Sequence, residues 1–175
     1  MRRKFPLVEI AIVVAAAALI YILERPRYQA NKAEIRQSDA VYNLYVYKAA
    51  IENYTVYHNG VYPTSPDSIG PYLEGGSAEN QTPGQYPQNP YTGEALAKKN
   101  IKWVMYSNIT DSRDDHPKGA NGRQQGSPGW ISVGWFIPPG ETLATDYGLI
   151  TFGTEGTPIY KKDPSGQEHI IVIHN

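Results

Sequence analysis

Residues 5–23 read FPLVEIAIVVAAAALIYIL, and this stretch decides which kind of fold the chain can adopt. Glu9 is its one charged residue, and alanine, leucine, isoleucine and valine predominate. As an α-helix rising about 1.5 Å per residue, it would be roughly 28 Å long, close to the thickness of a bilayer core. Arg2, Arg3 and Lys4 precede it, and cationic residues in this position favour a cytoplasmic N-terminus. The stretch therefore predicts a hydrophobic helix that is inserted in a membrane.

Glu9 allows two interpretations. A carboxylate is costly in apolar surroundings, so it needs either a partner or access to water. It lies four residues after Phe5, about 6 Å along a helix axis. If the chain were cleaved before Phe5, Glu9 of the same or a neighbouring chain could neutralise the new ammonium group. Alternatively, the side chain extends to the lipid headgroups, and the stretch alone favours neither interpretation.

The order of basic residues, Phe5, Glu9, an apolar run and Pro26 resembles the N-terminus of type IV pilins and of the pseudopilins of type II secretion. The later segments NGVYPTS, PYLEGG and NPYTGE are similar to that family too, so the resemblance covers residues 5–96. It implies that a prepilin peptidase cleaves between Lys4 and Phe5 and methylates Phe5, and that Glu9 guides assembly. Lys4 stands where the family usually has glycine.

The same resemblance implies partners and a location. Identical subunits would form a helical homopolymer with the help of the pilus assembly machinery. The precursor would lie in the inner membrane, and the filament would stand on the cell surface, or in the periplasm for a pseudopilin.

Five segments follow from the composition along the chain. They are a short basic leader (residues 1–4), a hydrophobic helix (5–25), an amphipathic continuation of that helix (26–59), a loop region (60–100) and a sheet region (101–175). Pro26 lacks an N–H group, so a kink or local melting of the helix is expected there. After Pro26, an apolar stripe recurs at spacings of three and four residues, which predicts the face that packs on a folded domain: Ala40, Leu44, Tyr47, Ile51 and Tyr54. Asn59 and Gly60 supply a helix stop.

The rest of the chain predicts an α+β fold. A short helix is expected over residues 66–73 with Ser65 as its N-cap, and NPYTG reads as a turn. Stretches rich in β-branched and aromatic residues predict strands at 101–107, 129–137, 147–153, 157–162 and 168–175. Within the second of these, Ile131, Val133, Trp135 and Ile137 alternate and should face the helix. Short antiparallel strands joined by turns would form a meander that packs on one long helix, and residues 110–129 would form an exposed loop.

Little in the sequence points to catalysis or to a cofactor. The net charge is −1, so the sequence lacks the excess of basic residues typical of nucleic-acid-binding proteins. It has no cysteine that could form a disulfide or a reactive thiolate. The four histidines have no zinc-ligand spacing, and no phosphate-binding or dinucleotide-binding motif is present. Asp111, Asp114 and Asp115 are weak candidates for a calcium site, although a solvated acidic loop explains them as well. The sequence thus predicts a structural filament subunit, not an enzyme, with a pseudopilin or a monomeric membrane-anchored binding domain as alternatives.

Overall fold

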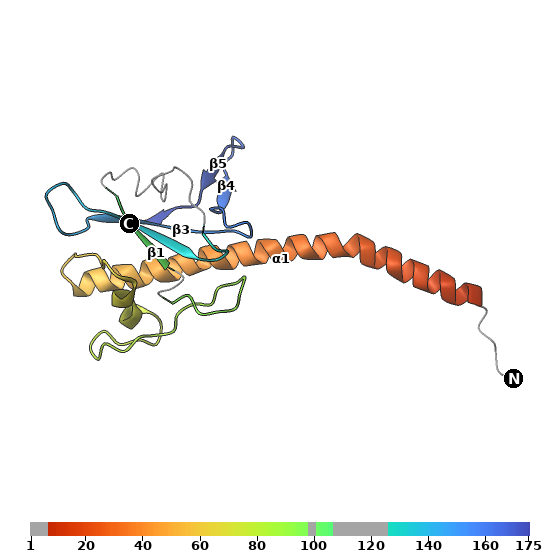
Figure 1. Cartoon of the computed structure of the whole chain (residues 1–175), viewed down its shortest axis with the longest axis horizontal. Coiled ribbons are helices and arrows are strands. Elements are labelled where there is room, and N and C mark those ends of the chain that lie inside the picture. The colour runs from red at the N-terminus through yellow and green to blue at the C-terminus, as the bar shows by residue number, and fades with distance from the viewer. Residues whose placement is uncertain (1–6, 98–100, 107–125) are drawn as a thin grey trace. The chain divides into compact units, whose positions relative to one another are not determined.

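The computed structural model describes residues 7–97, 101–106 and 126–175. Figure 1 shows one long helix, α1 (Leu7–Tyr57), followed by a 3₁₀ helix, η1 (Pro66–Tyr72), and by a set of short strands. The strands are β1 (Ile101–Tyr106), β2 (Ile131–Phe136), β3 (Asp146–Thr151), β4 (Tyr160–Lys162), β5 (Glu168–Ile170) and β6 (Ile173–His174). The predicted α+β class is confirmed, with each strand inside a stretch expected to be extended or within one residue of it.

The main sheet has the strand order β1-β2-β3-β6, and β4 and β5 form a separate two-stranded hairpin. Antiparallel pairing is confirmed for β2–β3, β3–β6 and β4–β5. It is wrong for β1–β2, which run parallel with Ile101 opposite Ile131. A parallel pair needs a crossover of a dozen or more residues, and residues 107–130 between the two strands are long enough to provide it. A simple meander is therefore not the topology of this sheet, and the loop predicted over 110–129 lies mostly outside the described residues.

Helix α1 contains 51 residues and has Pro26 in its interior. The helix is unbroken at this position, so the local melting predicted there is not seen in the single chain. At its other end, Asn59 and Gly60 have positive φ values of 53° and 86°, and the Gly60 amide donates to the Thr55 carbonyl at 2.9 Å. The predicted helix stop is confirmed, because a left-handed residue after the last turn lets the final carbonyls find donors.

None of the helices in the described residues is both long enough and apolar enough to cross a membrane. The membrane-inserted helix predicted over residues 5–23 is therefore not found among them.

The chain divides into two compact units, residues 1–35 and 36–175. The second unit holds the hydrophobic core. Leu44, Tyr47 and Ile51 of α1 pack with Val133 and Trp135 of β2, and all five side chains are fully buried. Ala40 is also buried and Tyr54 is half-buried, so the predicted stripe is confirmed as the face of α1 that packs against the sheet.

The loop region between α1 and the sheet is held by specific polar contacts. Ser65 caps η1 as predicted, since its Oγ accepts a hydrogen bond from the Asp67 amide at 3.3 Å. The Asn43 Nδ2 of α1 donates to the Gln88 carbonyl at 2.9 Å, and the Tyr47 hydroxyl donates to the Leu96 carbonyl. Two side chains of the helix therefore bind the backbone of the loop that follows it. Burial also raises the pKa of the Tyr47 hydroxyl.

Candidate functional site

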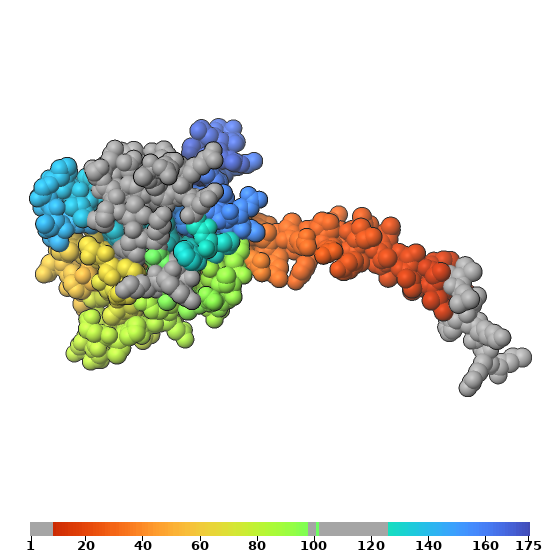
Figure 2. All heavy atoms as spheres, viewed as in Figure 1, coloured from red at the N-terminus to blue at the C-terminus, as the bar shows by residue number. Residues whose placement is uncertain are grey.

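The first half of α1 is apolar and uncovered. The large apolar side chains between Ile10 and Leu23 have exposed fractions from 50% to 66%, whereas the core residues of the same helix are at most 1% exposed. Figure 2 shows this segment, in red and orange, with its side chains open to solvent on the visible face. A contiguous apolar surface of this kind marks a site of interaction with another apolar surface.

Glu9 lies in the first turn of α1 and is exposed. A carboxylate at this end of a helix interacts favourably with the partial positive charge of the unpaired amides. This is a local reason for an acidic residue at position 9 that the sequence pattern did not reveal. Lys4 and Phe5, the predicted processing and methylation residues, lie outside the described residues, and so does the expected contact between the Phe5 amine and Glu9.

Charged residues surround Pro26, the third predicted assembly residue. The Arg27 Nη1 lies 3.5 Å from the Glu24 Oε1, and the Arg25 guanidinium lies 5.9 Å from the centroid of the Tyr21 ring. Pro26 has no amide hydrogen, so the Ile22 carbonyl loses its helical donor. Pro26 thus sits where the apolar half of the helix gives way to a polar segment.

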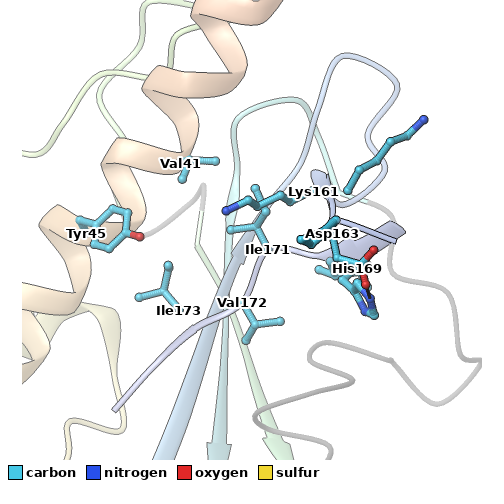
Figure 3. A pocket seen from close by; sticks show the side chains of 11 residues that line it. Val41, Tyr45, Lys161, Asp163, His169, Ile171, Val172 and Ile173 are labelled. Atoms are coloured by element: carbon cyan, nitrogen blue, oxygen red, sulfur yellow. Dashed lines mark hydrogen bonds and ion pairs between the residues drawn. The ribbon is translucent and has the colours of Figure 1, made fainter. Parts of the chain in front are cut away.

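A groove of about 860 Å³ lies in the second unit between α1 and the C-terminal segment (Figure 3). Val41 and Tyr45 of α1 line one side, and Ile171, Val172 and Ile173 form an apolar wall. The hairpin of β4 and β5 supplies polar groups to the groove, and of these Asp163 and His169 lie on the side away from α1 (Figure 3). The groove combines an apolar wall with a few charged side chains, a composition that ligand-binding clefts commonly have.

Asp163 organises the hairpin beside this groove. Its Oδ1 accepts hydrogen bonds from the Ser165 hydroxyl at 2.6 Å, the Ser165 amide at 2.8 Å and the Gln167 amide at 3.0 Å. Its Oδ2 lies 3.2 Å from the His169 Nε2. These hydrogen bonds, led by that of the Ser165 hydroxyl, lower the pKa of Asp163 to about 2. The role of this carboxylate is to hold a turn, and sequence analysis missed it.

The NPYTG segment is a turn, as predicted, and Asn89 is the residue that holds it. The Asn89 side chain is 1% exposed, its Oδ1 accepts from the Tyr91 amide at 2.9 Å, and its Nδ2 donates to the Pro128 carbonyl at 2.8 Å. A methyl group on Gly129 would come within 2.2 Å of the Asn89 Oδ1. Asn89 therefore joins the turn to the segment that leads into β2, a contact between residues far apart in sequence.

No group of three metal-ligating side chains is found in the part of the chain that the structure describes. The weak calcium candidates Asp111, Asp114 and Asp115 lie outside that part. Of the histidines, His58 stacks on Tyr54 with a centroid distance of 3.7 Å, and His169 pairs with Asp163. Both contacts are accounted for by packing and turn formation.

Comparison of the chain with protein-family models, with curated proteins and with solved structures finds no match in any of the three.

Proposed function

We propose that this protein is a structural subunit of a type IV pilus-like filament, assembled by bundling of N-terminal helices. The observation that carries the proposal is that the two halves of α1 differ in burial. Its second half buries a stripe in a folded α+β unit, while residues 10–23 expose a continuous apolar surface. Copies of the same segment, packed side by side, would remove that surface from water at a gain of roughly 25 cal/mol per Å².

The sequence order around this segment supports the same proposal. Basic residues, then Phe5, then Glu9 and an apolar run resemble pilin N-termini, and the loop segments up to residue 96 are similar as well. In this proposal Phe5, Glu9 and Pro26 act in assembly, and Lys4 and Phe5 flank the processing site. The partners are identical subunits, a prepilin peptidase and an assembly machinery.

The location is part of the proposal. The precursor would lie in the cytoplasmic membrane, where lipid covers the surface that neighbouring helices cover in the filament. A surface filament corresponds to a pilin, and a short periplasmic assembly corresponds to a pseudopilin. A membrane-anchored binding domain would remain a monomer.

Electron microscopy of material sheared from cells tests the proposal. Filaments that carry this protein, identified by an antibody against residues 36–175, are expected in the sheared fraction. Absence of filaments, with the protein monomeric in the membrane fraction, would rule out the filament function and favour the anchored binding domain. Filaments confined to the periplasm would favour the pseudopilin.

A further inference from the structure

A hollow of about 380 Å³ lies beside the end of η1 on the surface of α1, within residues 36–175. Tyr45, Ala49 and Asn53 line it from one face of α1, each about one helical turn after the last. The small side chain of Ala49 leaves space between the two longer ones. Tyr72 and Glu74, at the end of η1 and just after it, line the same hollow. It is here named the tyrosine cleft.

Three aromatic rings line the tyrosine cleft. Tyr42 and Tyr45 of α1 are 66% and 54% exposed, so their rings are open to a ligand. Tyr72 is half-buried, and its ring centroid lies 5.4 Å from that of Tyr54 and 5.6 Å from that of Tyr57. These neighbours hold the third ring in place before any ligand arrives.

Glu74 is the one charged residue among the described residues that line the tyrosine cleft, and it is exposed. Its backbone is held where two segments of the loop region cross. The Gln85 amide donates to the Glu74 carbonyl at 2.8 Å, and a Cβ atom on Gly84 would come within 2.5 Å of that carbonyl oxygen. Glycine is the residue that permits so close an approach, so the crossing places Glu74 at the cleft without help from its side chain.

The groups that line the tyrosine cleft together select a cation. The face of an aromatic ring carries a partial negative charge and a carboxylate a full one, so both attract a positively charged ligand. A neutral sugar needs several polar partners, whereas Asn53 and Glu74 are the polar side chains that the described lining offers besides the tyrosine hydroxyls. A methylated ammonium suits the cleft better than a bare one, because it is less strongly hydrated and its methyl groups can contact Val46 and Leu73.

We propose that the tyrosine cleft binds a small organic cation with a methylated ammonium group, of which choline is the simplest probe. The rings of Tyr42, Tyr45 and Tyr72 contact the methyl groups, and the Glu74 carboxylate balances the charge. The inference goes beyond the filament function and does not rest on it, because every residue that carries it belongs to one folded unit of a single chain.

Calorimetric titration of the full chain with choline, in a polyoxyethylene detergent that carries neither charge nor sugar, tests the proposal. The matched control ligand is 3,3-dimethylbutan-1-ol, which has the shape of choline with carbon in place of the charged nitrogen. Choline is expected to bind at a single site, about tenfold more tightly than the alcohol, because only the cation gains from the ring faces and the carboxylate. Equal affinities, or no saturable binding of choline, would overturn the proposal.

Substitutions at exposed positions locate the site. Glu74→Gln is expected to weaken choline binding at least severalfold and to leave binding of the alcohol unchanged. Its matched control is Glu79→Gln, which removes an exposed carboxylate that does not line the cleft. Tyr42→Phe keeps a ring and should retain choline binding, whereas Tyr42→Leu should weaken it. Equal effects of Glu74→Gln and Glu79→Gln, or of the two Tyr42 variants, would overturn the assignment of choline to this cleft.

A further variant fills the space that the ligand would occupy. Ala49 is exposed and helical, so Ala49→Leu is expected to leave the melting temperature unchanged and to abolish choline binding. Choline binding that survives this substitution, or binding of methyl glucoside in place of choline, would overturn the proposal.

A second ligand distinguishes the two sources of such a cation. Glycerophosphocholine carries the same ammonium group as part of a lipid headgroup. Its tighter binding would assign the cleft to a lipid, and tighter binding of choline would assign it to a soluble ligand. None of these titrations requires filaments, so their outcome is independent of the electron microscopy that tests the proposed function.

Discussion

At the scale of single residues, Glu9 is the side chain on which the proposed assembly depends most. In a bundle of apolar helices its carboxylate would be buried against the Phe5 amine, and removing one partner of such a pair costs about 3–5 kcal/mol. Glu9→Ala is therefore expected to leave the protein in the membrane fraction and to abolish sheared filaments. Glu24→Ala, which removes an exposed carboxylate, is the control and should assemble. Normal filaments from Glu9→Ala would contradict this role.

Asn89 is expected to matter for stability and not for assembly. Asn89→Ala removes the acceptor of the Tyr91 amide and the donor to the Pro128 carbonyl. Since an unpaired buried group costs about 1–3 kcal/mol, we expect the free energy of unfolding to fall by about 2–4 kcal/mol. Denaturant unfolding measures this, with Asn80→Ala on an exposed turn as the control. A loss below that of the control would show that the turn holds without Asn89.

At the scale of elements, the β4–β5 hairpin is expected to respond to acid through Asp163. Its pKa is lowered to about 2, so hydrogen bonds to the carboxylate stabilise the turn fully above the ordinary Asp value of 3.8. This contribution is lost as the pH falls from there through about 2. The amide NMR shifts of Ser165 and Gln167 should titrate with a midpoint near 2, and Asp163→Asn should remove that transition. A midpoint near 3.8 would show that the hydrogen bonds do not favour the charged form.

Helix α1 is expected to change at Pro26 on assembly. In the single chain the helix is unbroken, although an internal proline costs about 3 kcal/mol or more. Among neighbours, part of the segment from Ala18 to Arg25, beginning after Ala18, is expected to unwind and lengthen the subunit, since an extended residue rises about 3.3 Å and a helical one about 1.5 Å. Pro26→Ala should keep this segment helical and stiffen or destabilise the filament. A filament map with unbroken helical hydrogen bonds from Ala18 through Tyr28 in the native protein would contradict the prediction.

At the scale of the whole molecule, the buried core of the described residues lies within residues 36–175. Its buried cluster runs from Leu44 of α1 to Leu149 of β3, with η1 and Leu96 between them. A fragment of residues 36–175 is therefore expected to fold as a monomer, to unfold in one cooperative transition and to form no filaments. Circular dichroism, thermal unfolding and size-exclusion chromatography with light scattering measure this. An unfolded or aggregated fragment would show that residues 1–35 contribute to the fold.

The sequence alone determined the elements whose signals are local. The spacing of Ala40, Leu44, Tyr47 and Ile51 predicted the buried face of α1, because side chains three and four apart share a face of any helix. Asn59 and Gly60 predicted its end. The alternation of Ile131, Val133 and Trp135 predicted the face of β2 that joins the core, although residues 131–135 are buried on both faces. These patterns depend on backbone geometry over a few residues, so they can be read before the fold is known.

Only the tertiary structure decided the features that join distant residues. The parallel β1–β2 pairing, the hydrogen bonds of Asn89 to Pro128 and of Tyr47 to Leu96, and the groove between α1 and the C-terminal segment all link positions separated by many residues. Nothing in the local spacing of these residues specifies their partners. Strand direction and side-chain pairing follow from how the chain closes around its core, and that depends on all of residues 36–175 at once.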